Sequence, residues 1–206
     1  MDSQLLSILQ QTAELFMKYG IKSVTMDDIA RHLKMSKKTL YKYVKDKNDL
    51  VHKVMEAWIT VEQMNCTAII EGSENAIDEL IEISKRVSNE VTRIHPSVHY
   101  DMEKYHADAW RAFDSHKNEF ILNCIRKNLE NGIEEGLYRD NLNAQIISKL
   151  YVEKIDMIFD AAIFPPNEFN FHDVHLEMVR YHIRGIASPK GLEYLKERLT
   201  KETIQF

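Results

Sequence analysis

The sequence predicts an all-α protein, in which an N-terminal three-helix domain with a helix-turn-helix is joined by a long helix to a larger C-terminal helical domain. Three observations support this prediction. Apolar residues recur with helical spacing along the chain, and no segment shows the alternation of a strand. Two short helical segments are separated only by a link around Lys34 and Met35, which forces a sharp crossing. A Gly-Ser step at Gly72 marks the boundary between the two parts.

Composition favours a folded, cytoplasmic protein. Of 206 residues, 44% are hydrophobic and 29% charged, which suffices for a core and a solvated surface. No apolar run approaches the roughly 18 residues that span a bilayer, and the N-terminus lacks the features of a secretion signal. We therefore expect no membrane association. Cys66 and Cys124 have no metal-type spacing and are expected to be buried free thiols.

Charge is distributed unevenly along the chain. The net charge is -5, which by itself argues against a nucleic-acid partner. Residues 1–50, however, carry nine Lys and Arg against six Asp and Glu, or +3, and the remainder carries 18 against 26, or -8. A basic patch on an otherwise acidic chain favours a local contact with a polyanion.

The first two helices are predicted from an apolar face and a capping pattern. The first face comprises Leu5, Ile8, Leu9, Thr12, Leu15, Phe16 and Tyr19. Gly20 then ends this helix, which we interpret as scaffold. Thr25 begins the second helix, and Asp28 completes a capping box three residues later. The buried side of that helix is Ile29, Ala30 and Leu33.

The third helix is predicted from Lys37 to about Tyr43, capped by Ser36. Leu40 and Val44 are spaced to face inward. The outward-facing side chains are then Lys37, Lys38, Thr39, Tyr41, Lys42 and Tyr43. Lys donates to guanine or phosphate, Thr offers a hydroxyl and a methyl group, and Tyr reaches phosphates. An ordinary solvated basic face would explain the lysines but not the two tyrosines and the threonine among them.

The fourth helix is predicted to begin at Asp46, with Asp49 in the capping-box position. Lys47 lies in its first turn, where the helix dipole disfavours a cation. A phosphate beside that N-terminus would offset the cost, so Lys47 is a candidate phosphate ligand. The apolar stripe continues past Leu50 to Ile59, which predicts a rigid connecting helix over about residues 46–70.

These segments resemble the N-terminal domain of the TetR family of transcriptional regulators. The resemblance rests on ILQQTAELFMKYG, TMDDIA and MSKKTLYKYVKDKNDL, which agree with the family pattern in spacing and residue type across three helices. It implies that Lys37, Lys38 and Tyr41 contact base edges, with Thr39 and Lys42 as further candidates. It also implies that Thr25, Ser36, Tyr43 and Lys47 bind phosphate.

The sequence departs from the family pattern at two positions. Lys34 stands where the family often has glycine, and we expect a turn without a left-handed residue there. Val44 replaces the usual phenylalanine, which predicts a smaller core contact.

The C-terminal part, residues 71–206, is predicted to be a helical domain for effector binding and dimerisation, beside a DNA-binding domain at residues 1–50. Helices are expected over about residues 75–94, 99–116, 117–135, 144–164, 172–187 and 188–201. The segment NGIEEGLYRDNLN resembles the end of the family's seventh helix and its turn into the eighth.

Two of these helices, at about residues 144–164 and 172–187, are apolar on more than one side, which requires burial on two sides. In a chain of this size the second side is expected to meet another copy, and two such helices with their twofold mates form a four-helix bundle. The family resemblance also implies this bundle. The candidate interface residues are Ile147, Leu150, Ile158, Met178 and Tyr181.

Chemistry-bearing groups are sparse in the C-terminal part. An aromatic and methionine set is the candidate effector pocket, although ordinary core explains it equally well: Tyr100, Met102, Tyr105, Trp110, Phe113 and Tyr151. His95 and His99 are four residues apart, but Pro96 breaks the helix that would align them, so no metal site is expected. Catalytic motifs are missing from the sequence, so we expect neither an enzyme nor a cofactor.

Together these features predict a dimeric regulator that binds a palindromic operator in double-stranded DNA and is released by a small-molecule effector. Two alternatives stay open. The same fold could act as an activator or answer to a partner protein. Alternatively, the C-terminal helices could form an enzyme or carrier domain with an accessory DNA-binding arm.

Overall fold

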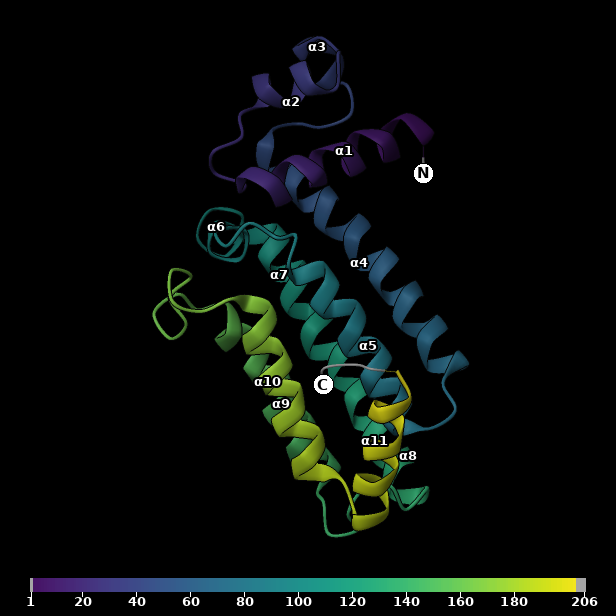
Figure 1. Ribbon diagram of the computed structural model, residues 1–206. Coiled ribbons are helices and arrows are strands. Elements are labelled where there is room, and N and C mark those ends of the chain that lie inside the picture. Colours follow the sequence, from purple (N-terminus) through teal and green to yellow (C-terminus); the bar gives the residue numbers. More distant parts are fainter. Residues whose placement is uncertain (1, 203–206) are drawn as a thin grey trace. The chain divides into compact units, whose positions relative to one another are not determined.

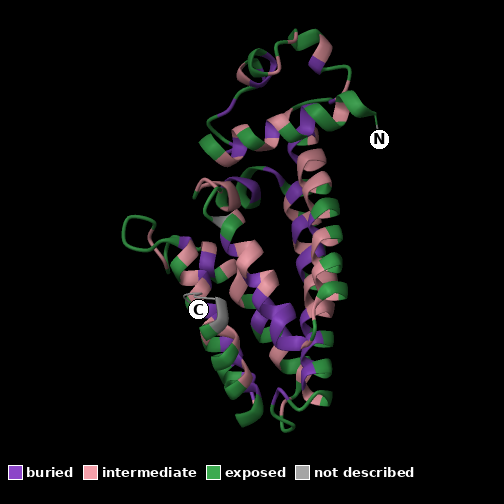
Figure 2. Cartoon of the chain, turned by 45° about the vertical axis from the view of Figure 1, so that its right-hand side comes forward, coloured by how far each residue is buried: buried purple, intermediate pink, exposed green. Residues whose placement is uncertain are grey.

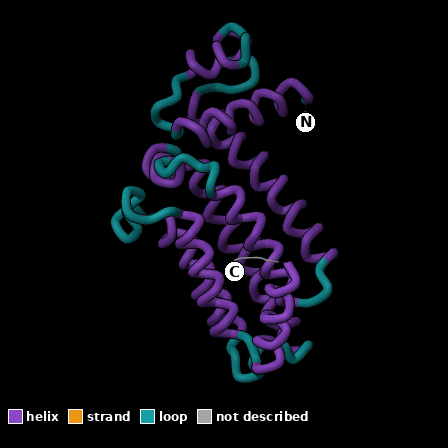
Figure 3. Tube along the Cα trace, viewed as in Figure 1, coloured by secondary structure: helices purple, strands orange, loops and turns teal. Residues whose placement is uncertain are grey.

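The computed structural model describes residues 2–202, apart from the side chains of Val91, Lys201 and Glu202, and confirms the all-α prediction (Figure 1). The helices are α1 Ser3–Tyr19, α2 Met26–His32, α3 Lys37–Leu40, α4 Lys47–Gly72, α5 Ala76–Val91, α6 Val98–Tyr105, α7 Ala107–Ser115, α8 Leu122–Glu134, α9 Ala144–Phe159, α10 Phe171–Ile186 and α11 Pro189–Glu202. A π-helical segment, His116–Ile121, connects α7 to α8. Across the described chain the trace contains helices and loops but no strand (Figure 3).

The described residues form two compact units. Unit 1 comprises residues 2–64 and 93–116, and unit 2 comprises residues 65–92 and 117–202. These units are defined by spatial contacts. The predicted division into functional domains at residues 1–50 and 71–206 stays a prediction. None of the described helices is both long enough and apolar enough to span a membrane.

The core of unit 1 joins the apolar faces of the first four helices. Its most deeply buried members are Ile8, Leu9, Phe16, Ile29, Leu40, Val44, Leu50 and Val51. Gly20 ends α1 with a φ of 78°, and its N–H donates to the carbonyl of Phe16 at 2.9 Å. A Cβ at this position would meet Oγ of Ser97 at 2.4 Å, so both the backbone angle and the close approach require glycine.

Residues 93–116 belong to unit 1 although they are distant from α1 in sequence. The N–H of His95 donates to the carbonyl of Met17 at 2.7 Å. Asp101 is 4% exposed, and its carboxylate accepts from the N–H of Lys22 at 2.9 Å. These bonds attach the segment containing α6 to the end of α1 and the loop that follows it.

Unit 2 is organised around α5, which packs on α8 and α10, while α9 packs on α8 and α10. Helices in Figure 2 carry buried residues on their inner sides and exposed residues on the outer ones. The core cluster includes Ile77, Leu80, Ile81, Leu129, Tyr138, Val179 and Ile183. Because α5 contributes buried residues in every turn of its first half, it serves as the central helix of this unit.

The turn after α8 is fixed by a tyrosine that lies against a glycine. A Cβ on Gly132 would come within 2.1 Å of the Tyr138 ring, so only glycine fits there. The Tyr138 hydroxyl lies 3.0 Å from the Asn128 side-chain oxygen and 3.0 Å from the carbonyl of Ala76. Asn128 donates to the same carbonyl at 2.8 Å. This buried network connects α5 to α8 and the following turn.

Several helix ends differ from the predicted ones. The helix predicted to reach about residue 164 ends at Phe159, where Asp160 adopts an extended conformation and precedes a turn. The one predicted to reach Ile94 ends at Val91. The helix predicted from Lys117 is π-helical as far as Ile121 and becomes the α-helix α8 only at Leu122, and the π-helical segment continues directly from α7. Apolar periodicity carries little information about such ends, because it is insensitive to the hydrogen-bond pattern of the last turn.

Candidate nucleic-acid interface

The N-terminus of α2 has the capping box that the sequence predicts. The Thr25 hydroxyl oxygen accepts from the N–H of Asp28 at 3.2 Å. In return the Asp28 carboxylate accepts from the Thr25 N–H at 3.0 Å and from its hydroxyl. The hydrogen bonds that Asp28 accepts from the Thr25 hydroxyl and from the Thr25 N–H hold the pKa of its carboxyl group below its usual value. The hydroxyl of Thr25 is therefore engaged within the helix cap.

The turn between α2 and α3 corrects one expectation. Lys34 has a φ of 52°, so the turn does contain a left-handed residue, although that residue is not glycine. The N–H of Met35 reaches back to the carbonyl of Ala30 at 3.0 Å, and the N–H of Lys34 to that of Arg31 at 3.1 Å. This closing pattern satisfies the last carbonyls of α2 and needs a left-handed residue at Lys34. The geometry of the turn outweighs the modest cost of a side chain there, about 1–2 kcal/mol.

Ser36 caps α3 as predicted, and its Oγ accepts from the N–H of Thr39 at 3.1 Å. Leu40 and Val44, which are 0% and 2% exposed, anchor the inner side of this segment. Regular α-helix ends at Leu40, three residues earlier than predicted, and a turn carries the chain through Tyr43. The inward side is therefore fixed by two apolar residues in the manner that their spacing predicts.

The predicted DNA-contacting side chains occupy the outer surface of this motif to different extents. Thr25, Ser36, Lys37, Lys38, Tyr41 and Lys42 are exposed, whereas Thr39, Tyr43 and Lys47 are partly buried. Thr39 Oγ1 lies 2.9 Å from the Ser36 hydroxyl, so part of its hydrogen-bonding capacity is used locally.

Lys37 forms an ion pair across the motif. Its Nζ lies 2.8 Å from Asp27, and both side chains are largely exposed. The hydrogen bond to Asp27 raises the pKa of Lys37, which keeps this lysine charged. An exposed pair of this kind is weak, so a phosphate can compete for the lysine.

Lys47 has a structural role as well as a basic charge. Its Nζ donates to the carbonyl of Ile21 at 2.7 Å and lies 3.4 Å from that of Lys22, which ties α4 to the loop after α1. Partial burial lowers the pKa of Lys47. Asp46 and Asp49 cap this end of α4, because Asp46 accepts from the Asp49 N–H and Asp49 accepts from the Lys45 N–H.

Sequence reasoning did not include two basic residues beside this set. Arg31, at the end of α2, has a side chain that is 79% exposed and lies 3.5 Å from Asp28. Lys53 donates to the carbonyl of Tyr43 at 3.0 Å and to Asp49 at 2.8 Å, so it holds the end of the turn that follows α3. The four-residue spacing from Asp49 to Lys53 was the available signal for that contact.

Five of the six candidate pocket residues lie in unit 1. Met102 and Phe113 are buried, while Tyr100 and Tyr105 are 52% and 41% exposed and make ring contacts with each other. Trp110 packs beside Phe113 with ring centroids 5.7 Å apart.

Tyr151, the sixth candidate, lies in unit 2 on α9 with its ring 4.7 Å from that of His182. Burial raises the pKa of Tyr151 to about 12 and lowers that of His182 to about 4. Both groups are therefore uncharged at neutral pH.

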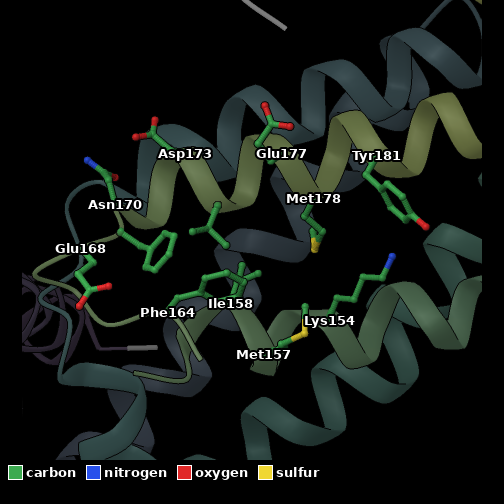
Figure 4. Close-up of a pocket in the computed structure, with 12 residues that line it drawn as sticks. Lys154, Met157, Ile158, Phe164, Glu168, Asn170, Asp173, Glu177, Met178 and Tyr181 are labelled. Atoms are coloured by element: carbon green, nitrogen blue, oxygen red, sulfur yellow. The ribbon is translucent and has the colours of Figure 1, made fainter. Parts of the chain in front are cut away.

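The face shared by α9 and α10 contains two adjoining grooves. One, of about 490 Å³, is lined by Lys154, Met157, Ile158, Phe164, Glu168, Phe169, Asn170, Asp173, Val174, Glu177, Met178 and Tyr181. The other, of about 740 Å³, includes Ile147, Leu150, Tyr151, His182 and Arg184. In Figure 4 the side chains of Met157 and Met178 approach each other across the first groove, and Lys154 approaches Tyr181. Nζ of Lys154 lies 5.0 Å from the centre of the Tyr181 ring.

The candidate interface residues lie on this face at different depths. Leu150 and Tyr181 are 55% and 75% exposed. Ile147 is partly buried, and Ile158 and Met178 lie beneath the surface. Among the described residues there is no group of three or more His, Cys, Asp or Glu side chains arranged for a metal ion.

Known proteins similar to this chain include bacterial transcriptional regulators. The family described as bacterial regulatory proteins, tetR family, matches residues 8–54, which cover most of α1, all of α2 and α3, and the start of α4. YvaF, an uncharacterized HTH-type transcriptional regulator of Bacillus subtilis, is 26% identical over 183 residues, covering 88% of this chain and 94% of YvaF.

Solved structures share the fold. A TetR-family regulator from Agrobacterium tumefaciens superposes with a TM-score of 0.73 at 13% identity, over 90% of this chain and 98% of that one. FadR from Bacillus subtilis, in complex with stearoyl-CoA, gives 0.68 at 15% identity over 88% and 98%. A putative regulator from Saccharomonospora viridis, in complex with choline, gives 0.72 at 13% identity over 91% and 100%. With the helix-turn-helix and its capped helices, these matches show that residues 8–54 are similar to the tetR family of bacterial regulatory proteins and that the chain shares the fold of solved transcriptional regulators.

Proposed function

We propose that the protein is a dimeric transcriptional repressor, which binds a palindromic operator through α3 and leaves it when a small-molecule effector binds. The outer face of α3 is the observation that supports the DNA contact. Leu40 anchors the helix on its buried side, while Lys37 and Lys38 of α3 and Lys42 of the following turn are exposed. A helix presented in this way fits the major groove, where lysines reach guanine edges and phosphates.

Within this proposal some side chains contact the DNA bases and others contact the phosphate backbone. Lys37, Lys38 and Tyr41 contact bases, and Thr39 and Lys42 support them from the same segment. Thr25, Ser36, Tyr43 and Lys47 position the protein on the backbone. The caps formed by Thr25 and Ser36 leave them within reach of phosphate, whereas Lys47 contributes its charge while it holds the loop after α1.

Dimerisation is supported by the exposed apolar residues of α9 and α10. Leu150 and Tyr181 present large side chains to solvent beside Ile147, over the buried Ile158 and Met178. A second copy would cover these side chains and complete a four-helix bundle. Two copies of α3 related by a twofold axis match the symmetry of a palindrome, whose half-sites lie about 34 Å apart or a multiple of that distance.

Release by an effector is supported by the ligands of two structures with the same fold. FadR from Bacillus subtilis binds stearoyl-CoA, and the Saccharomonospora viridis protein binds choline. We propose that this chain also responds to a small molecule. The candidate contacts in unit 1 are Tyr100, Met102, Tyr105, Trp110 and Phe113, and Tyr151 of unit 2 is a separate candidate. A coupling of about 1–3 kcal/mol between effector and operator would suffice to shift occupancy.

Selection from a random duplex pool tests the DNA proposal. At moderate salt we expect the wild-type protein to enrich palindromic sequences. Binding that shows no sequence preference would overturn operator recognition. A reporter placed behind the enriched site should then be repressed when the protein is present. Activation of the reporter would refute the repressor role and keep the DNA contact.

Two single variants test the division of DNA contacts. Tyr41→Ala should weaken binding to the enriched site more than to random DNA, because base contacts carry specificity. Lys47→Ala should weaken binding to both and lower its salt dependence, because phosphate contacts release counterions. Equal losses on both kinds of DNA for both variants would contradict the division. Thermal unfolding of Lys47→Ala separates lost phosphate contact from loosening of the loop that Lys47 holds.

A further inference from the structure

One side of α10 carries four charged residues in a regular order. Asp173, Glu177, Arg180 and Arg184 are spaced by four, three and four positions, which places them in one stripe along the helix. Asp173, Glu177 and Arg184 are exposed, and Arg180 is partly buried. Figure 4 shows Asp173 and Glu177 extending from the same side of α10. The charges therefore run from two acids to two bases along an accessible surface.

This order is antisymmetric about a single point. The midpoint between Glu177 and Arg180 lies between Met178 and Val179, and the midpoint between Asp173 and Arg184 is the same. If two copies of α10 cross antiparallel at that point, each acid faces a base and no like charges meet. A shift of the crossing by one helical turn would place like charges opposite each other, and only one register pairs all four charges of each copy with opposite charges.

We propose that α10 pairs with α10 of a second copy in this register, with Asp173 opposite Arg184 and Glu177 opposite Arg180. The inference rests on the dimer proposed above and goes beyond it, because it assigns the crossing point and the residues that select the partner. Surfaces that pair through charge complementarity reject partners that present like charges. The stripe therefore restricts dimerisation to copies of this chain.

A polar atom on the stripe that lacks a hydrogen-bond partner supports this assignment. Arg180 already contacts Glu177 of its own helix through one terminal nitrogen. Its Nε is buried and lacks a hydrogen-bond partner among the described residues. The Arg180 side chain is 27% exposed, and it would have to turn outward for this donor to meet a carboxylate of a second copy. Exposed Tyr181, on the neighbouring stripe, supplies apolar area beside the charges.

The helix dipole accounts for part of the pattern without any partner. Acids near the N-terminus and bases near the C-terminus stabilise a helix, which explains Asp173 and Arg184. Glu177 and Arg180 lie in the middle, where the dipole contributes little. The test therefore exchanges only the two inner charges.

Four proteins are compared: wild type, E177R, R180E and the double variant E177R/R180E. In E177R and in R180E, two copies place like charges opposite each other twice, so each homodimer should dissociate about tenfold more readily at low salt. A mixture of E177R with R180E restores both contacts. Differently tagged subunits, mixed and separated by native mass spectrometry, should then form the heterodimer well above the statistical half.

The double variant gives the sharper result because it keeps the net charge and the contact between residues 177 and 180 of one helix. It should dimerise as tightly as wild type, yet it should exchange poorly with wild-type subunits, because like charges then meet at both inner positions. These preferences should shrink as salt rises.

Glu193 and Lys196 of α11 provide the matched control, because they have the same spacing, opposite charges and exposed side chains. E193R and K196E should dimerise as wild type does and mix statistically. If E177R and R180E behave like this control pair while all proteins dimerise, the register is wrong and the dimer stands. If wild type sediments as a monomer at micromolar concentration, the dimer fails and the register with it.

Discussion

Helices α3 and α10 each place exposed polar residues above a buried apolar side, but the two exposed surfaces differ in charge. The outer residues of α3 and the turn that follows it include three exposed lysines, and Leu40 lies beneath them at 0% exposure. The outer residues of α10 combine balanced acids and bases with Tyr181, and Val179 lies beneath them at 0% exposure. A surface of one charge favours a polyanion, whereas a balanced surface with apolar residues favours a folded partner.

The two units also differ in how their helices are held. In unit 1 the N-termini of α2 and α3 depend on caps within three residues, Thr25 with Asp28 and Ser36 with Thr39, beside distant contacts such as that of Lys47 with Ile21. In unit 2 the decisive polar contacts join residues far apart in sequence. Arg198 contacts Asp78 at 2.8 Å, and Ser88 contacts His175 at 2.9 Å. Substitutions that affect one unit and not the other would sharpen this contrast.

The largest expected effect comes from removing a buried leucine in either unit. Leu40→Ala and Leu129→Ala are matched, because both side chains are 0% exposed. Each should lower the free energy of unfolding by about 2–5 kcal/mol. Trp58 and Trp110 both lie in unit 1, so their fluorescence follows that unit while circular dichroism follows both.

We expect Leu40→Ala to shift the tryptophan transition and to abolish specific DNA binding, because α3 loses its anchor. Leu129→Ala should shift the dichroism transition first. Identical shifts of both signals in both variants would mean that the two units unfold together. The units would then not differ in stability.

Acid should lower the free energy of unfolding of unit 2, because α10 contains a buried histidine, His175. Burial lowers the pKa of His175 to about 4, with His172 adding to the effect, whereas an unfolded histidine has a pKa near 6.5. The contribution of neutral His175 to the free energy of unfolding is fully present above pH 6.5. It is lost as the pH falls towards 4 and changes no further below that pH. At pH 5 the loss is about 2 kcal/mol for this residue.

Urea unfolding between pH 7 and 5, followed by circular dichroism, measures this loss. His175→Gln keeps a polar partner for Ser88 and removes the titration, so its stability should depend less on pH than that of wild type. His182, whose pKa burial also lowers to about 4, remains in the variant and sets the residual slope. An unchanged pH dependence in His175→Gln would show that His175 does not titrate as proposed.

A smaller effect is expected where the Tyr138 ring covers Gly132. In Gly132→Ala the new methyl group would lie within 2.7 Å of three ring atoms, and the buried tyrosine has little room to move. We expect a loss of about 1–3 kcal/mol in the free energy of unfolding, measured by urea titration. Gly72→Ala is the control, because a Cβ there meets nothing within 4 Å. Equal stability of both variants would mean that the ring moves aside at no cost.

The elements that the sequence predicts correctly share a physical property. The caps at Thr25 and Ser36 and the inward positions Leu40 and Val44 depend on neighbours within four residues, so spacing alone determines them. The predicted placement of the outer lysines of α3 follows from the same spacing.

Other features depend on groups that spacing does not bring together. Lys47 Nζ finds the carbonyl of Ile21, and Asp101 finds the N–H of Lys22, across 26 and 79 residues. The left-handed Lys34 follows from the closing bond between Met35 and Ala30, and that geometry outweighs the preference for glycine. Local propensity contains no term for such contacts.

The smallest expected effect concerns the exposed ion pair between Asp27 and Lys37. Asp27→Asn should leave the free energy of unfolding nearly unchanged, because both side chains are largely solvated. It removes a negative charge beside the proposed DNA-contacting surface and frees Lys37. We therefore expect DNA affinity to rise a few-fold, with the gain largest at low salt.

Asp108→Asn is the matched control, because Asp108 pairs with Arg111 on α7 and is 60% exposed, close to the 61% of Asp27. It removes the same charge from the same unit, so any general electrostatic effect appears in both variants. A gain in DNA affinity confined to Asp27→Asn would connect Lys37 to the contact surface. Equal gains would instead mean that the overall charge of unit 1, and not the lysine on α3, governs affinity.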